Sequence, residues 1–89
     1  MQIQNNTYKI ILQEVTKGKT YKISVKCNNT YNFSFINKTS KTNIMIPGSI
    51  GANTSHKEII YTAQADGKLI LVNSPNRSWT TAEVIVEEM

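Results

Sequence analysis

Residues 20–27 alternate strictly between apolar and polar side chains, and this period of two constrains the fold more than any other feature of the chain. The apolar positions are Tyr21, Ile23, Val25 and Cys27. A strand places every second side chain on the same face, whereas a helix repeats every 3.6 residues and would scatter these four around its surface. The segment is therefore predicted to be a β-strand with one buried face.

The rest of the chain carries further strand signals separated by turn residues. Apolar alternation or β-branched runs occur at residues 8–15, 31–35, 57–63, 68–73 and 79–88, with shorter candidates at 43–46 and 3–7. The strongest turn signals between them are Gly18, Asn28-Asn29, Pro47-Gly48 and Asp66-Gly67. The sequence predicts an all-β protein of seven to eight antiparallel strands, either a sandwich or a partly open barrel.

The turns and the hydrophobic runs also predict how some strands are arranged. The short connections near Gly18 and Asn28 suggest that the first three main strands, between residues 8 and 35, form a meander. Residues 68–73 are apolar on both faces, which is typical of a central strand covered on both sides. Residues 47–55 contain two glycines and no periodicity, so we expect one long loop there.

The length and composition limit the chain to one domain, residues 1–89. A chain of 89 residues hides roughly 64% of its surface on folding, which is enough for one modest core. Ten Asn, ten Thr and seven Ser favour turns and strand faces over helix interiors, and twelve Ile favour strands.

The order of these segments resembles that of small jelly-roll sandwiches. The resemblance rests on residues 18–25 (Gly-Lys-Thr-Tyr-Lys-Ile-Ser-Val), 31–35 (Tyr-Asn-Phe-Ser-Phe), 60–63, 66–67 and 69–72, and it spans residues 8–88. Similar patterns occur in carbohydrate-binding modules and in the pre-peptidase C-terminal type of bacterial domain. The resemblance implies a jelly-roll-like fold and a binding role. Pre-peptidase domains often bind calcium through acidic residues, but Asn32 and Ser34 stand where a strand with carboxylates would be.

The ionisable and nucleophilic side chains form no recognisable catalytic or metal-binding pattern. No nucleophile and base have a spacing typical of a catalytic pair, and the single histidine, His56, lies 29 positions from the single cysteine, Cys27. We therefore expect a protein without enzymatic activity, metal or cofactor. Cys27 is expected to be a buried structural thiol, and His56 a solvated loop residue.

The two halves of the chain differ in charge. Residues 1–45 hold seven Lys and one Glu, a net charge of +6, whereas residues 46–89 have a net charge of −2. Such a dipole could bring copies of the protein together or attract an acidic partner. The alternative is two solvated faces that neutralise each other where the first and last strands pair.

The lysines near the first turn form a candidate basic face. Its members are Lys17, Lys19, Lys22 and Lys26. Together with nearby tyrosines, this face could bind single-stranded nucleic acid. However, Tyr21 shares a face with Ile23, and the chain has only one arginine, which disfavours nucleic acid as a partner.

A second candidate site lies before the last strand. Asn76, Arg77 and Trp79 bring together an amide, the single arginine and the single tryptophan, a combination that suits a sugar face or a protein hot spot. The alternative is that Trp79 covers the core.

The sequence shows no export or membrane signal. The opening residues lack a basic leader and an apolar run, and the longest apolar run, residues 69–72, is far shorter than a membrane span. We expect a soluble protein in the cytoplasm of the producing cell or in a virion. The leading hypothesis is a structural or attachment protein, a small bacteriophage accessory protein for capsid decoration or the tail. Its expected partners are other protein subunits, with homo-oligomers included. The alternatives are a carbohydrate-binding module for cell-surface glycans and a single-stranded nucleic-acid-binding β-barrel.

Overall fold

The fold consists of β-strands, as predicted. The computed structural model describes residues 2–5, 9–73 and 80–89, and these residues contain strands and no helix. The strands are β1 (Gln2–Asn5), β2 (Lys9–Val15), β3 (Thr20–Cys27), β4 (Tyr31–Asn37), β5 (Asn43–Met45), β6 (Thr54–Thr62), β7 (Gly67–Asn73) and β8 (Thr80–Glu88). In the part of the chain that the structure describes, no helix is long and apolar enough to cross a lipid bilayer.

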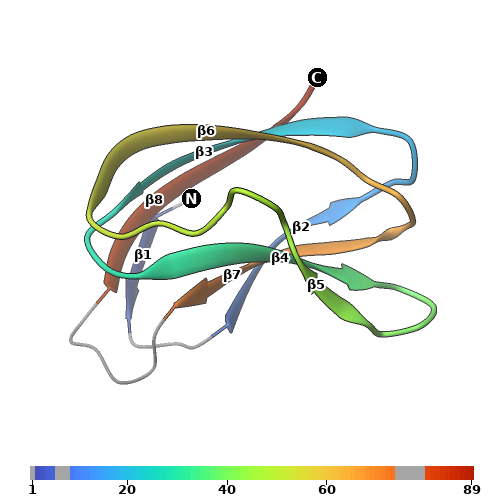
Figure 1. Ribbon diagram of the computed structural model, residues 1–89, viewed down its shortest axis with the longest axis horizontal. Helices are drawn as coiled ribbons and strands as arrows, with labels where there is room; N and C mark the ends of the chain where they lie inside the picture. Colours follow the sequence, from blue (N-terminus) through green and yellow to red (C-terminus); the bar gives the residue numbers. More distant parts are fainter. Residues whose placement is uncertain (1, 6–8, 74–79) are drawn as a thin grey trace.

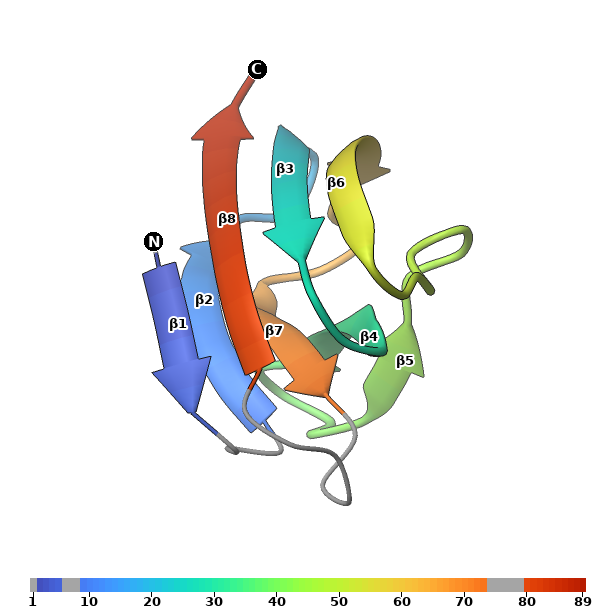
Figure 2. The same ribbon diagram turned by 90° about the vertical axis from the view of Figure 1, so that its left-hand side faces the viewer.

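The strands form two four-stranded antiparallel sheets that pack as a sandwich (Figure 1). Their orders are β1-β8-β3-β6 and β2-β7-β4-β5, and Figure 2 shows the strands of the first sheet side by side in this order. The chain pairs as a set of nested partners, β4 with β5, β3 with β6, β2 with β7 and β1 with β8, which alternate between the sheets. This nesting is the jelly-roll topology. The predicted jelly-roll-like sandwich is confirmed, and the sheets are not closed into a barrel.

The predicted meander of the first three main strands is wrong. β2 and β4 lie in one sheet, whereas β3 lies in the other, so each connection crosses between sheets. Gly18 has the expected positive φ of 84°, but its turn does not close a hairpin. Instead, Gly18 N donates to Ala63 O at 2.8 Å, and Ala63 N donates to Lys19 O at 2.9 Å. The β2–β3 and β6–β7 connections therefore bond to each other at one end of the sandwich.

The core lies between the sheets, on the faces that the alternation predicts. Ile23 and Val25 of β3 are at most 2% exposed, and Ala82 and Val84 of β8 are each 1% exposed. The burial of each larger aliphatic side chain contributes roughly 1.5–3 kcal/mol. Together these side chains hold the first sheet onto the second.

β7 is a central strand, as its two apolar faces predict, because it lies between β2 and β4. Leu69 and Leu71 belong to the core. Ile70 points to the other face of the sheet and is 1% exposed. The strand is therefore covered on both faces.

The segment between β5 and β6 is partly ordered by β4. Ile46 N donates to Phe33 O at 2.9 Å, and Gly51 exchanges two backbone hydrogen bonds with Tyr31 at 2.9 and 3.0 Å. Gly51 can approach this closely because it lacks a Cβ. A Cβ at this position would clash with the Tyr31 phenol ring. β6 starts at Thr54, so the predicted loop ends earlier than expected and His56 lies in a strand rather than in that loop.

Candidate functional site

An apolar groove opens between the edge strands β5 and β6. Its volume is about 470 Å³. It is lined by Phe35, Asn37, Ile44, Met45, Ile46, Pro47, Tyr61, Thr62, Gln64 and Ala65. We call this feature the edge groove. Tyr61 is its only ionisable side chain, and partial burial raises the pKa of the Tyr61 phenol above its ordinary value.

The groove forms because the two sheets end at edge strands that do not meet. β5 has three residues, all of them exposed. Ile44 lies opposite Phe35 in the β4–β5 register, so it faces the same side of the sheet as a core ring but lies at the rim. The ring centroids of Phe35 and Tyr61 are 6.0 Å apart, and these rings bridge the two sheets beneath the groove.

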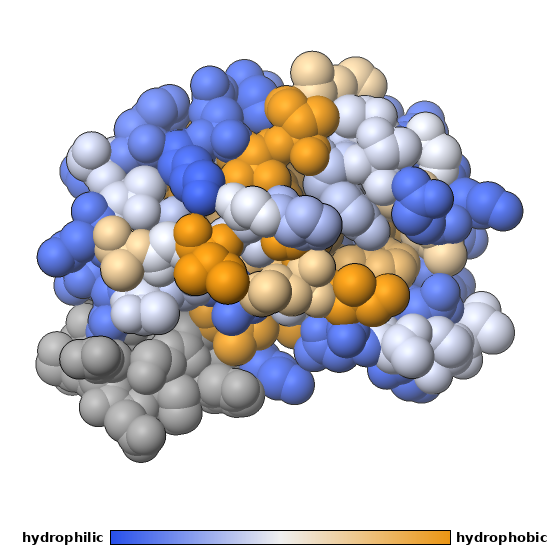
Figure 3. Space-filling model, in the orientation of Figure 1, coloured by the Kyte–Doolittle hydropathy of each residue, from blue (hydrophilic) through white to orange (hydrophobic). Residues whose placement is uncertain are grey.

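The rim of the edge groove exposes two large apolar side chains. Ile44 is 59% exposed, and Met45 is 48% exposed. We call these two residues the apolar rim. Ile50 in the following loop is also 59% exposed, but it does not line the groove. In Figure 3 strongly hydrophobic atoms gather on the middle of this face, over β5 and the segment that leads to β6.

A lysine ties the loop that carries Ile50 to the first sheet. Lys57 Nζ donates to Gly48 O at 2.8 Å and to Ile50 O at 3.3 Å. Since Lys57 belongs to β6, this contact holds the loop that carries Ile50 against the edge of the first sheet.

The candidate basic face is interleaved with carboxylates. Lys22 and Lys26 of β3 lie opposite Glu87 and Glu83 of β8 in the strand register. Lys22 Nζ also lies 3.2 Å from Glu58 Oε2. The structure thus brings basic residues of the first half of the chain beside acidic residues of the second half.

The other two lysines of this face lie at the β2–β3 turn. Lys19 Nζ lies 3.5 Å from Glu88 Oε2, and the backbone N–H of Lys17 donates to Asp66 Oδ1 at 2.8 Å. Exposed ion pairs of this kind contribute at most about 1 kcal/mol each. Nucleic acid binding by the candidate basic face stays a prediction.

The other sequence-predicted site, Asn76, Arg77 and Trp79, lies outside the described residues. These residues belong to the connection between β7 and β8. Their role in sugar or protein binding also stays a prediction.

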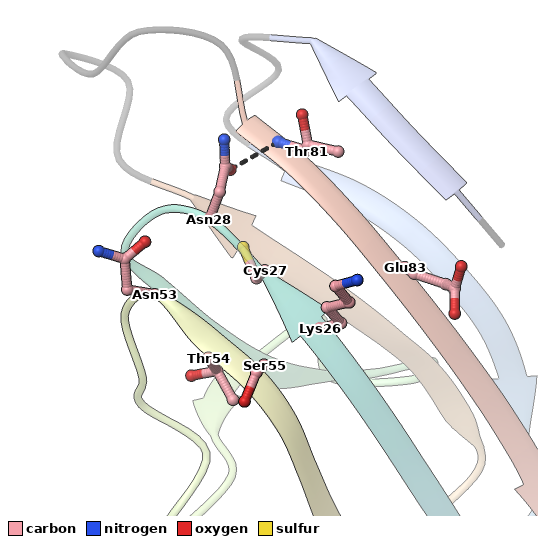
Figure 4. Close-up of a pocket in the computed structure, with 8 residues that line it drawn as sticks. All are labelled: Lys26, Cys27, Asn28, Asn53, Thr54, Ser55, Thr81 and Glu83. Atoms are coloured by element: carbon pink, nitrogen blue, oxygen red, sulfur yellow. Dashed lines mark hydrogen bonds between the residues drawn. The ribbon is translucent and has the colours of Figure 1, made fainter.

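A second, more polar depression lies at one end of the first sheet (Figure 4). Its volume is about 290 Å³, and it is lined by Lys26, Cys27, Asn28, Asn53, Thr54, Ser55, Thr81 and Glu83. We call it the end hollow. These residues come from the end of β3 and the beginnings of β6 and β8, which are far apart in the sequence. The sequence analysis missed both depressions because each depends on strand pairing across long separations.

The single cysteine is buried, as predicted. Cys27 is 3% exposed, and burial raises the pKa of its thiol above the ordinary value, an effect that backbone hydrogen bonds from Asn29 and Asn28 partly oppose. His56 is exposed, and its Nε2 lies 3.9 Å from Glu58 Oε1. Across residues 2–5, 9–73 and 80–89, no three His, Cys, Asp or Glu side chains are grouped so that they could hold a metal ion.

No protein-family model matches the sequence, and no curated protein matches it either.

Proposed function

We propose that this protein is a non-enzymatic structural or attachment protein that packs against other protein subunits through the edge groove. The observation that carries the proposal is the apolar rim, which exposes two large apolar side chains, Ile44 and Met45, beside an apolar depression at a sheet edge. Exposed apolar surface of this kind marks protein interaction sites. Open sheet edges offer further unpaired backbone groups for a partner.

The occupant that we propose for the groove is a second copy of the chain. The apolar rim and the groove lie on the same face, so a two-fold axis can place the rim of each copy in the groove of the other. The groove lining carries no formal charge at neutral pH, which matches an apolar rim made of Ile44 and Met45. Because the same patch serves both copies, the contact closes as a dimer.

The setting that we propose is a virus particle, as a capsid decoration or tail protein of a bacteriophage. Two observations support it. The strand order is that of the jelly rolls used in viral capsid proteins as well as in lectins. The sequence is rich in Asn, Ile and Lys, as expected from an AT-rich genome.

The self-association can be tested by size-exclusion chromatography with light scattering over a range of protein and salt concentrations. We expect a dimer whose population rises with protein concentration and changes little with salt, because its contacts are apolar. Ile44→Asp should weaken dimerisation by about tenfold or more, since it buries a charge in the interface.

The matched control is Ile60→Asp. Ile60 is 56% exposed, close to the value for Ile44, but it is not part of the groove lining. We expect this variant to dimerise like the wild type. A wild-type protein that stays monomeric at every concentration, or an equal loss of dimer in both variants, would contradict the proposal.

A further inference from the structure

Three turns meet at one end of the sandwich, and Asp66 joins them. The β2–β3, β4–β5 and β6–β7 connections all lie at the right-hand end of Figure 1. Asp66 O accepts from Lys38 N at 2.9 Å, and Asp66 Oδ1 accepts from Lys17 N at 2.8 Å. Gly18 N donates to Ala63 O at 2.8 Å. These hydrogen bonds link the three turns into one continuous surface.

This surface carries four exposed lysines from separate parts of the sequence, which are Lys17, Lys38, Lys41 and Lys68. We call them the lysine cluster. Lys68 follows Gly67, which lies opposite Asn37 in the β4–β7 register, and Lys41 N donates to Asn37 O at 2.9 Å. The cluster therefore lies around the β6–β7 turn. Three of its members are absent from the candidate basic face, because strand pairing rather than sequence makes them neighbours.

The positive charge of the lysine cluster is not neutralised by ion pairs. Within residues 2–5, 9–73 and 80–89, none of its four ammonium groups forms an ion pair or a hydrogen bond. Lys19 and Lys22, in contrast, pair with glutamates of the first sheet. Two carboxylates lie among the clustered lysines, Asp66 and Glu14, which is opposite Lys68 in the β2–β7 register. Four positive and two negative charges leave a net charge of +2.

The mixture of charges indicates which kind of anion fits this surface. A nucleic-acid backbone is negative at every nucleotide, so part of it would lie against Asp66 and Glu14. A protein can instead place carboxylates at the lysines and hydrogen-bond donors at these two acidic groups. Residues 16–19, 38–42 and 63–66 of the three turns include none of the exposed large apolar side chains, which insertion into a lipid surface requires. Protein carboxylates are therefore the anions that match the surface best.

We propose that the lysine cluster binds an acidic segment of another protein through its carboxylate groups. The contact is weak and sensitive to salt, because all four lysines are exposed to solvent. This surface goes beyond the proposed dimer interface and does not depend on it, since no lysine of the cluster lines the edge groove.

The test is an NMR titration of the isotope-labelled full chain with a synthetic peptide in which Glu and Ser alternate. The same peptide with Gln in place of Glu is the uncharged control. Oligothymidylate and vesicles that contain phosphatidylglycerol represent the other two classes of polyanion. We expect the Glu peptide to cause saturable shifts of the backbone amide signals of the lysine cluster, which disappear in high salt. Absence of these shifts, larger shifts at Lys22 and Lys26, or tighter binding of oligothymidylate or vesicles would overturn the proposal.

Paired charge variants assign the binding to this end of the sandwich. Lys38→Gln combined with Lys68→Gln should weaken binding of the Glu peptide about fivefold or more, because it removes two of the four ammonium groups. The control is Lys22→Gln combined with Lys26→Gln, which changes the net charge equally but lies in β3 of the first sheet. It should change the affinity less than about twofold. Equal losses in the two double variants would show attraction by net charge alone and would overturn the site.

Asp66→Asn should change the affinity in the opposite direction. The Asn side chain keeps an Oδ1 acceptor for Lys17 N but removes a negative charge from among the lysines. We therefore expect it to bind the Glu peptide about twofold more tightly. Unchanged or weaker binding by a variant with a native amide spectrum would contradict the proposal. Ile44→Asp should keep peptide binding even if it dissociates the dimer, so the two proposals fail independently.

Discussion

At the scale of single residues, the buried hydroxyl group of Ser49 forms hydrogen bonds with the backbone of β4, as a neighbouring strand would. It is 0% exposed, and its Oγ accepts from Phe33 N at 3.1 Å. The hydroxyl group in turn donates to Ile46 O at 2.6 Å or to Phe33 O at 3.0 Å. Ser49→Ala leaves a buried N–H of β4 without this partner, so we expect the free energy of unfolding to fall by about 1–3 kcal/mol.

Urea unfolding of this variant and of Ser55→Ala tests the role of Ser49. Ser55 is exposed and its side chain makes no hydrogen bond within residues 2–5, 9–73 and 80–89, so its substitution should change stability by less than about 0.5 kcal/mol. Similar losses for the two variants would show that the buried hydroxyl is not special.

The thiol of Cys27 gives a second prediction at this scale. Its burial both blocks reagents and raises its pKa, so less thiolate is present at pH 8 than for an exposed cysteine. We expect an aromatic disulfide reagent to modify the native protein on the order of tenfold more slowly, or slower still, than the protein in guanidinium. Equal rates, followed by absorbance, would contradict this.

At the scale of elements, the strands could be predicted because their signals are local. The alternation of residues 20–27 and 79–88 predicts both strands and their inward faces, and the structure buries Ile23, Val25, Ala82 and Val84 on those faces. The partition into sheets could not be predicted, because a turn residue such as Gly18 permits a hairpin or a crossing equally. Hydrogen bonds to distant residues, such as the bond from Gly18 N to Ala63 O, decide between the two arrangements.

The same limit applies to the candidate sites. Cys27 lies opposite both Thr54 and Ala82, and no sequence pattern links those positions. The end hollow and the edge groove therefore follow from the topology. In contrast, Asn76, Arg77 and Trp79 could be predicted as a candidate site because they are neighbours in the chain.

The hairpin between β4 and β5 allows a prediction for one element. Its turn is held by Asn37 Oδ1, which accepts from Thr39 N at 2.8 Å and Ser40 N at 3.0 Å, and Lys41 adopts a φ of 62°. Glycine adopts this conformation without the steric cost of a Cβ. We expect Lys41→Gly to raise the free energy of unfolding by about 0.5 kcal/mol, after the entropic cost of glycine is subtracted.

Lys38→Gly is the control for this hairpin, because Lys38 lies in the same turn without a positive φ. It should lose about 0.5 kcal/mol through backbone entropy alone. Thermal unfolding distinguishes the variants, and a loss of stability in both would contradict the role assigned to the Lys41 conformation.

At the scale of the whole molecule, the nested topology interleaves the two oppositely charged halves. β3 carries lysines and lies between β6 and β8, where Glu58, Glu83 and Glu87 are found. Part of the charge difference that is evident along the sequence is therefore compensated within one sheet, whereas Lys9 lies in β2 of the other sheet. We base the proposed association on apolar contact at the edge groove rather than on a charge dipole.

Nesting also predicts the order of folding. Among the strands that the structure describes, only β4 and β5 pair across a short connection. Each later pair in the nest closes a longer loop unless the inner pair has formed first. We expect folding in milliseconds to seconds, as for other all-β domains, with the β4–β5 region formed early. Phe35→Leu, opposite Ile44, should then mainly slow folding, whereas Ala82→Gly, opposite Ile3 and Cys27, should mainly speed unfolding. Stopped-flow measurements in urea separate the two effects, and the reverse assignment would mean that the outer strands, not the hairpin, nucleate the fold.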